Sequence, residues 1–156
     1  MKPFAKSEKN SGKKNLLLVI DSNVYIFGFG FIKVPACDNL ILAILEKYNL
    51  HTLRIPRRIV EEVHSHLSPE DFTKFIRVIN TLTTIDEDFV VPFEIATKYE
   101  VKGLKPADAF IAAYTEWVGA DVLVTENRHF LSRNPNLPFK ILDADNCLKF
   151  IRASFQ

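Results

Sequence analysis

The 156-residue sequence lacks the features that several classes of protein require. It has only two cysteines, Cys37 and Cys147, which are far apart and form no Cys-x-x-Cys pair, so neither a disulfide framework nor a zinc site is indicated. Histidines do not supply a zinc site either, because His64 and His66 lie two residues apart on a predicted helix and face different directions. This cysteine usage fits a reducing, cytoplasmic setting.

Long apolar runs and an excess of one charge are also missing. No stretch is long enough to span a membrane, and the short run at 16–20 is ended by Asp21, too early for the core of a signal peptide. The 20 Lys and Arg against 19 Asp and Glu leave a net charge of +1. That balance excludes a strongly basic nucleic-acid binder, but it allows a local basic groove.

The residues that are present fit one α/β domain. Residues 1–15 are polar and lysine-rich and predict a disordered tail, which leaves 16–156 as a single domain with neither repeat nor linker inside 16–151. Buried apolar strands are predicted at 16–20 and 121–125. Further strands are predicted at 51–56, which Pro56 ends, at 83–85 and at 139–142. Helical spacing and start signals predict helices at 24–31, 38–47, from 57, 68–79, 92–101, 106–117 and 144–151. This alternation predicts a three-layer α/β/α sandwich with a mostly parallel central sheet.

Polar residues recur where the predicted elements begin or end. Asp21 and Asn127 follow two buried strands, Glu62 lies early in a helix, and Asp108 lies in the first turn of another. The carboxyl ends of parallel strands meet at one edge of a sheet, so these side chains are expected to converge there. Converging carboxylates repel one another unless a cation neutralises them, and oxygen ligands favour Mg²⁺ or Mn²⁺. Such a site can activate a water molecule against a phosphodiester.

Each of these positions also has an ordinary structural explanation. Asp21 suits a turn or a helix N-cap, Asp108 suits the positive end of a helix, and Asn127 suits a cap for the short segment through Phe130. The acidic run at 86–88 is interpreted as a solvated turn rather than a metal site. Glu61 is an alternative to Glu62, and Glu126 could supply the charge that Asn127 lacks. Side chains alternate along an extended segment, however, which would point Glu126 away from the site.

Four segments carry these residues in a fixed order: 19–26 with Asp21, 55–63 with an acid six residues after proline, 106–113 with Asp108, and 119–130 with a Thr-x-Asn-x-x-Phe core. They resemble the four motifs of PIN-domain proteins, including the VapC-like ribonuclease toxins. The resemblance extends over nearly the whole chain from Leu16. Its spacing selects Glu62 as the acid of the second motif.

The resemblance implies a metal-dependent endoribonuclease that hydrolyses RNA. Asp21 and Asp108 would bind Mg²⁺ or Mn²⁺, and Glu62 would position the metal ion or the attacking water. Hydrogen bonds that orient these acids would come from Ser22, Asn23 and Thr125. Asn127, where many members carry aspartate, would ligate through its amide oxygen or hold a water. A homodimer is also implied, and an antitoxin protein is the expected partner if the chain is a toxin.

Basic residues next to the acid motifs are candidates for contacts with RNA phosphates. We predict such contacts for Arg57, Arg58, Lys105 and Arg128. Scattered surface charge is the alternative for each of them. A binding module for RNA or protein with weak or no catalysis is the alternative for the whole chain, and the acids that it retains favour the enzyme.

Overall fold

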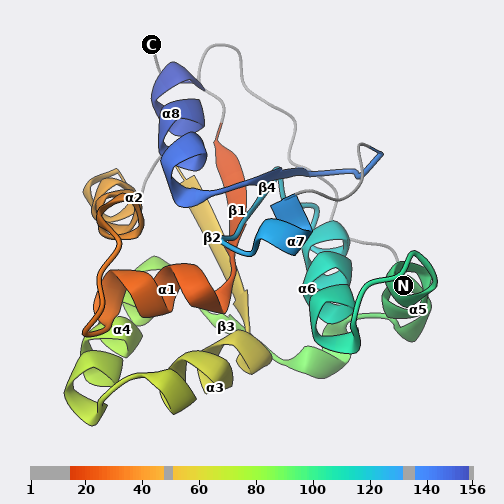
Figure 1. Ribbon diagram of the computed structural model, residues 1–156, viewed down its shortest axis with the longest axis horizontal. Helices are drawn as coiled ribbons and strands as arrows, with labels where there is room; N and C mark the ends of the chain where they lie inside the picture. The colour runs from red at the N-terminus through yellow and green to blue at the C-terminus, as the bar shows by residue number, and fades with distance from the viewer. Residues whose placement is uncertain (1–14, 48–50, 132–135, 155–156) are drawn as a thin grey trace.

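The computed structural model describes residues 15–47, 51–131 and 136–154. Residues 1–14, most of the predicted tail, lie outside this part, and Asn15 is exposed. Five parallel strands form the middle layer in the order β3-β2-β1-β4-β5 (Figure 1). Their bounds are β1 Leu16–Ile20, β2 His51–Pro56, β3 Ile85–Asp86, β4 Val122–Val124 and β5 Lys140–Leu142. The predicted sandwich is confirmed, and every pair of neighbouring strands is parallel rather than most of them.

The central strand, β1, owes its place to its apolar sequence. Four of its five residues are fully buried, as expected for a strand covered on both faces of a parallel sheet. It pairs with β2 from Leu16 opposite His51, and with β4 from Leu18 opposite Val122. The peptide N–H of Asp21 then donates to the carbonyl of Val124, so the ends of β1 and β4 lie side by side.

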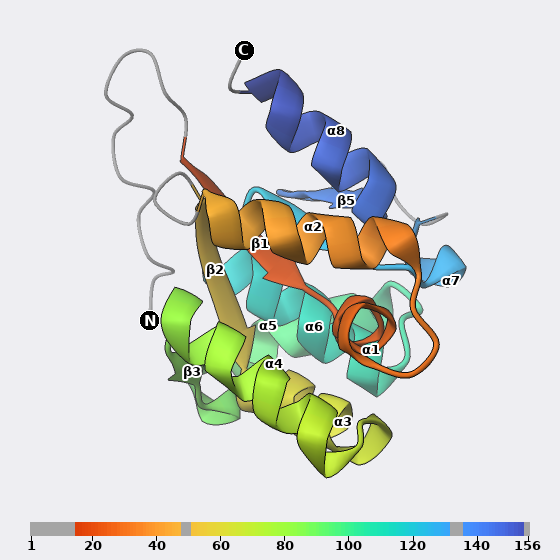
Figure 2. The same cartoon turned by 90° about the vertical axis from the view of Figure 1, so that its left-hand side faces the viewer.

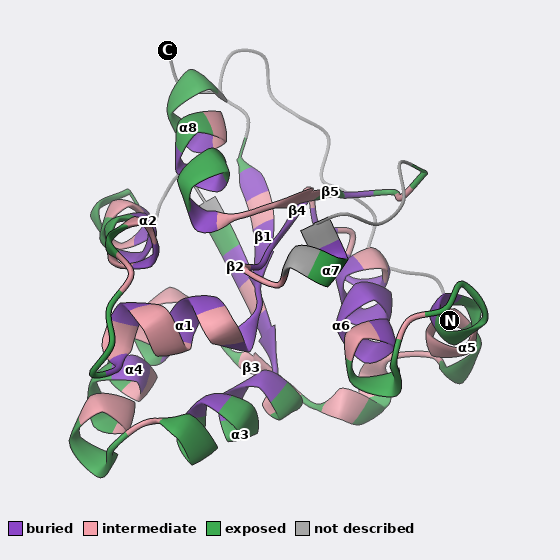
Figure 3. Cartoon of the chain, in the orientation of Figure 1, coloured by how far each residue is buried: buried purple, intermediate pink, exposed green. Residues whose placement is uncertain are grey.

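Helices cover both faces of the sheet. In Figure 2, α1, α2 and α4 lie in front of it, and α5 and α6 lie behind it. Their bounds are α1 Ser22–Phe29, α2 Pro35–Glu46, α3 Arg57–His66, α4 Pro69–Leu82, η2 Asp88–Val90, α5 Phe93–Val101, α6 Pro106–Trp117, α7 Arg128–Leu131 and α8 Ala144–Ser154. Figure 3 shows the buried residues concentrated on the inner strands and along α6, where the core of the domain lies.

Several boundaries differ from the predicted ones. The helix predicted behind an Asp38 cap begins one turn earlier, at Pro35, because proline has the backbone angle of a first helical turn and lacks the N–H that would be unpaired there. The first helix begins at Ser22 rather than Val24, since the Asp21 carboxylate caps it. The short third strand is at Ile85–Asp86 rather than 83–85.

Two predictions about the described residues concern what is absent. Cys37 and Cys147 are both buried and unbridged, which agrees with the absence of a disulfide pattern. Within the described ranges, no helix is both long and apolar enough to cross a membrane.

Candidate active site

Asp21 lies at the carboxyl end of β1 and is only 8% exposed. One carboxylate oxygen accepts from the backbone N–H of Ser22 at 2.8 Å and lies 3.5 Å from its hydroxyl. The other accepts from the hydroxyl of Thr125 at 2.9 Å. The Asp21 carboxylate therefore lies at the edge of the core, where it accepts hydrogen bonds from residues that follow the adjacent strands β1 and β4.

The pKa of Asp21 is raised above its ordinary value of 3.8. Burial is the main cause, because a charge loses its hydration there, and the negative charges of Glu62 and Asp108 add to it. The hydrogen bonds from Thr125 and Ser22 act in the opposite direction. Glu62 from α3 and Asp108 from α6 are thus near enough for their charges to act on Asp21.

Glu62 and Asp108 are held less closely than Asp21. Glu62 is exposed on α3, and Asp108 is half-buried in the first turn of α6. Neither carboxylate accepts a hydrogen bond from a residue within the described ranges. Both acids therefore have oxygen atoms available for a ligand.

Thr125 is the centre of a hydrogen-bond network that holds Asp21. Besides donating to Asp21, its hydroxyl oxygen accepts from the side-chain amide of Asn23 at 3.3 Å and from the backbone N–H of Asn127 at 3.1 Å. The side-chain oxygen of Asn23 in turn accepts from the N–H of Glu126 at 3.1 Å. The predicted supporting residues are therefore all in contact with Asp21 or with each other.

Asn127 was predicted either to serve the metal site or to cap the short segment that follows it, and the structure contains the capping contact. Its side-chain oxygen accepts from the backbone N–H of His129 at 3.0 Å, which caps the short helix α7. An amide oxygen has a second lone pair, so this bond leaves room for a further partner. The side chain of Arg128, a predicted RNA contact, lies outside what the structure describes.

Of the two alternative acids, Glu126 points away from Asp21. Its carboxylate accepts from the backbone N–H of Ala144 at 2.9 Å and lies 3.8 Å from the sulfur of Cys37. Glu61 is exposed on α3. The pKa of Arg57 is raised chiefly by its hydrogen bond to Glu87, and the charge of Glu61 adds to this effect. Glu62, the acid selected by the motif spacing, is the one of these three glutamates whose charge acts on Asp21.

The acidic run at 86–88 is not a solvated turn, because each acid pairs with a residue from β2 or α3. Asp86 accepts from the guanidinium of Arg54 at 2.8 Å, Glu87 pairs with Arg57 at 2.8 Å, and Asp88 accepts from the backbone N–H of Arg58 at 3.0 Å. The solvated-turn interpretation was therefore wrong. The signal in the sequence was the pair of arginines, Arg54 and Arg57, that match the acids at 86–87, but using it requires knowing that β2 and β3 pair.

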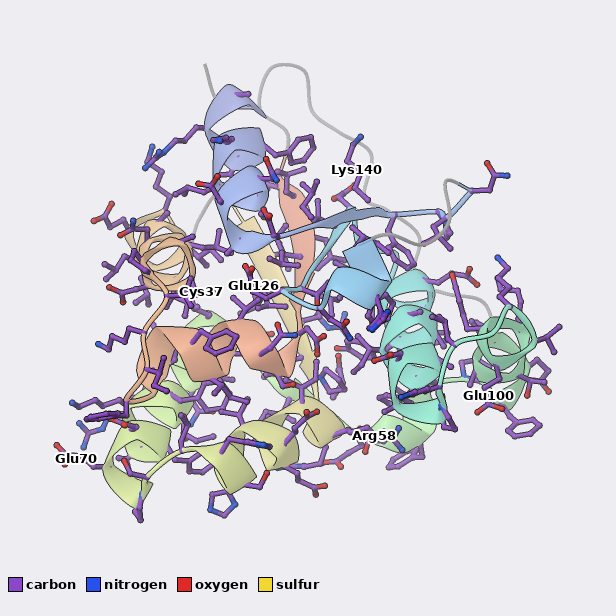
Figure 4. All side chains as sticks on the ribbon, in the orientation of Figure 1. Cys37, Arg58, Glu70, Glu100, Glu126 and Lys140 are labelled. Carbon is purple, nitrogen blue, oxygen red and sulfur yellow. The ribbon has the colours of Figure 1, made fainter. Side chains whose placement is uncertain are left out.

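The predicted RNA-binding cations differ in what surrounds them. Arg57 is held by Glu87, whereas the guanidinium of Arg58 lies 4.3 Å from the centroid of the Phe110 ring and makes no ion pair with a described residue. In Figure 4, Arg58 lies between α3 and the start of α6, the two helices that carry Glu62 and Asp108. Lys105 is exposed and immediately precedes α6.

The oxygen donors of these acids suit Mg²⁺ or Mn²⁺. The acids supply only oxygen ligands, and their mutual repulsion is relieved by a cation. In the part of the chain that the structure describes, however, no three Asp, Glu, His or Cys side chains are close enough together to hold one ion. Mg²⁺ commonly keeps several waters and binds only one or two carboxylates directly, so a group of three acids is not required for it.

Comparison with known proteins identifies the fold. No family model and no curated protein matches the sequence. The structure is similar to VapBC2 from Rickettsia felis bound to a DNA fragment from its promoter, with a TM-score of 0.57 and 17% identity over 82% of this chain and 98% of that chain. PAE2754 from Pyrobaculum aerophilum gives 0.53 and 18%, over 92% and 94%. FitAcB from Neisseria gonorrhoeae gives 0.51 and 14%, over 81% and 97%. The chain has a PIN-domain fold.

This fold agrees with the resemblance found in the four motifs. The alignments cover 94–98% of the PIN-domain neighbours' chains. Identities of 14–18% show the fold alone. What the PIN domain does in this protein has to be argued from its own side chains.

Proposed function

We propose that this PIN domain is a metal-dependent endoribonuclease that hydrolyses RNA phosphodiester bonds. One observation carries the proposal: Asp21 is buried at the carboxyl edge of the sheet, and the charges of Glu62 and Asp108 act on it. A buried carboxylate beside two further acids opposes folding even when it accepts hydrogen bonds, and a bound cation would offset that cost.

Asp21 and Asp108 would hold the Mg²⁺ or Mn²⁺ ion, and Glu62, the acid of the second motif, would orient a water molecule beside the ion. When bound, the ion would neutralise charge on the phosphodiester and lower the pKa of a coordinated water. Thr125 and Ser22 keep one orientation of the Asp21 carboxylate through their hydrogen bonds. Asn127 would contribute the second lone pair of its amide oxygen, directly or through a water.

Phosphates of the RNA would lie along the side where α3 and α6 begin. Arg58 and Lys105 supply exposed positive charge there, next to the helices that carry Glu62 and Asp108. Arg57 would contribute only in competition with Glu87. Arg128 stays a prediction.

A binding module with weak or no catalysis is the second candidate. It is favoured by the separation of the acids, since no metal-binding group of three is formed among the described residues. This candidate predicts RNA binding that neither needs a divalent ion nor leads to cleavage.

Cleavage assays on unpaired and structured RNAs, with Mn²⁺, Mg²⁺ or EDTA, separate the two candidates. The enzyme cleaves with either ion and stops in EDTA, and both Asp21→Asn and Asp108→Asn abolish cleavage. Asp145→Asn is the matched control, because it removes an exposed acid on the surface of α8 that, among the described residues, pairs with Lys149 alone. Wild-type cleavage by either active-site variant would contradict the assignment.

We propose further that the chain is the toxin of a toxin–antitoxin pair. VapBC2 and FitAcB are complexes of PIN-domain toxins with antitoxins. An open groove of about 440 Å³ lies between the end of α1, α2 and α4 and would suit an apolar segment of an antitoxin. Its apolar lining includes Phe29, Phe31, Ile41, Leu42, Leu45 and Val78. Co-purification with the product of a neighbouring gene tests this pairing.

Two further expectations accompany this function. A homodimer would bury some of the exposed apolar side chains, such as Phe89, Phe93 and Val101, and light scattering measures its mass. A cytoplasmic location would keep the buried thiols of Cys37 and Cys147 reduced.

A further inference from the structure

Glu126 joins three parts of the fold that are distant in the sequence. It lies in the loop between β4 and α7, and its carboxylate accepts from the N–H of Ala144, the first residue of α8. The same oxygen lies 3.8 Å from the sulfur of Cys37, in α2. Figure 4 shows Cys37 and Glu126 where α2, α8 and this loop meet.

The backbone of the same residue is tied to the candidate metal site. The N–H of Glu126 donates to the side-chain oxygen of Asn23, whose amide donates to the hydroxyl of Thr125. Thr125 in turn donates to Asp21. Two hydrogen-bonded side chains therefore connect the backbone of Glu126 to the buried carboxylate of Asp21.

A carboxylate suits the outer end of this connection. The first turn of α8 carries unpaired N–H groups and the positive end of the helix dipole, which favour a negative acceptor. The fully buried thiol of Cys37 has a pKa raised to about 12, chiefly by burial, so it stays protonated and can donate. The carboxylate is thus fixed from two sides, and the loop that it belongs to has little freedom to shift.

We propose that Glu126 is a positioning residue, which anchors the β4–α7 loop to α8 and α2 and so holds Asn23 and Thr125 in the arrangement that orients Asp21. This role rests on the proposed function, because it concerns Asp21 as a metal ligand. It differs from supplying a missing charge to the site, since the carboxylate of Glu126 faces α8 and α2.

The test compares Glu126→Ala with Asp143→Ala. Asp143 also caps α8, through the N–H of Asn146 at 2.7 Å, but it has no bond to the network around Asp21. Both variants are expected to lower the melting temperature. Only Glu126→Ala is expected to speed the hydrogen exchange of the backbone N–H groups of residues 126 and 127, and to weaken Mn²⁺ binding by about tenfold, the lower end of the losses seen when a residue behind a metal ligand is removed.

Glu126→Gln keeps the acceptor oxygen but removes the charge, so it is expected to fold and to show a smaller change in both measurements. Equal exchange at residues 126 and 127 in Glu126→Ala and Asp143→Ala would overturn the proposal and leave Glu126 as a helix cap. If Glu126→Ala does not fold, Glu126→Asp replaces it, because its side chain is one carbon too short to keep both contacts; wild-type exchange and Mn²⁺ affinity in Glu126→Asp then overturn the proposal. Absence of Mn²⁺ binding by the wild-type protein would contradict the proposed function, whereas the exchange measurement still decides whether Glu126 anchors the loop.

Discussion

Replacing Arg58 with alanine is expected to remove one phosphate contact, whereas replacing its neighbour Arg57 is expected to remove much less. The guanidinium of Arg58 lies over the Phe110 ring, between the helices that carry Glu62 and Asp108, with no described acid paired to it. The guanidinium of Arg57 already donates to Glu87 at 2.8 Å. Both variants lose the same unit of charge, so the difference between them reports direct contact.

The size of the effect follows from counterion release. Each phosphate contact on single-stranded nucleic acid contributes about 0.7 to the slope of log affinity against log salt. A fourfold rise in salt therefore weakens binding by about 2.6-fold for each contact, so the Arg58→Ala variant should lose about 2.6-fold less than the parent protein over that rise. Fluorescence anisotropy with a single-stranded RNA measures the slope, in an Asp108→Asn background that leaves the RNA uncut.

Glu87→Gln provides the complementary control. It releases Arg57 from its ion pair, so the slope is expected to steepen by up to about 0.7 as Arg57 becomes available to a phosphate. Equal slopes for Arg57→Ala and Arg58→Ala would refute the reasoning, because the pairing with Glu87 would then make no difference to RNA binding.

Three further variants test the site and the core. In EDTA at pH 7, Asp21→Asn is expected to melt at a higher temperature than wild type. Because the pKa of Asp21 is raised in the folded protein, wild type is most stable below pH 3.8 and loses stability as the carboxyl ionises at higher pH. The difference in melting temperature should therefore vanish in acid. Calorimetry with Mn²⁺ should show tighter binding for Asn127→Asp and weaker binding for Asn127→Ala, which also loses the α7 cap at a cost of about 1 kcal/mol. Identical affinities would leave Asn127 as a cap alone. Phe75→Ala, at the fully buried ring that contacts Tyr25 and Phe29, should cost about 3–5 kcal/mol in denaturant unfolding.

The sequence alone determined those strands and helices whose ends are set by neighbouring residues. The strands at Leu16–Ile20 and His51–Pro56 have the predicted bounds, because the first is an apolar run ended by an acid and the second is ended by a proline. The helix at Pro106–Trp117 likewise begins at its proline. The order and spacing of the motifs singled out Asp21, Glu62 and Asp108, and in the fold burial and the charges of the other two acids together raise the pKa of Asp21.

Only the tertiary structure decided which partner each polar side chain takes. Asp86, Glu87 and Asp88 look like a solvated turn until β2 and β3 pair and bring residues 54–58 against them. Glu126 and Asn127 are adjacent in the sequence, yet one carboxylate reaches Ala144 and the other side chain caps α7. A charged or amide side chain accepts hydrogen bonds from any donor within reach, and the donors within reach are fixed by elements packed from distant parts of the chain.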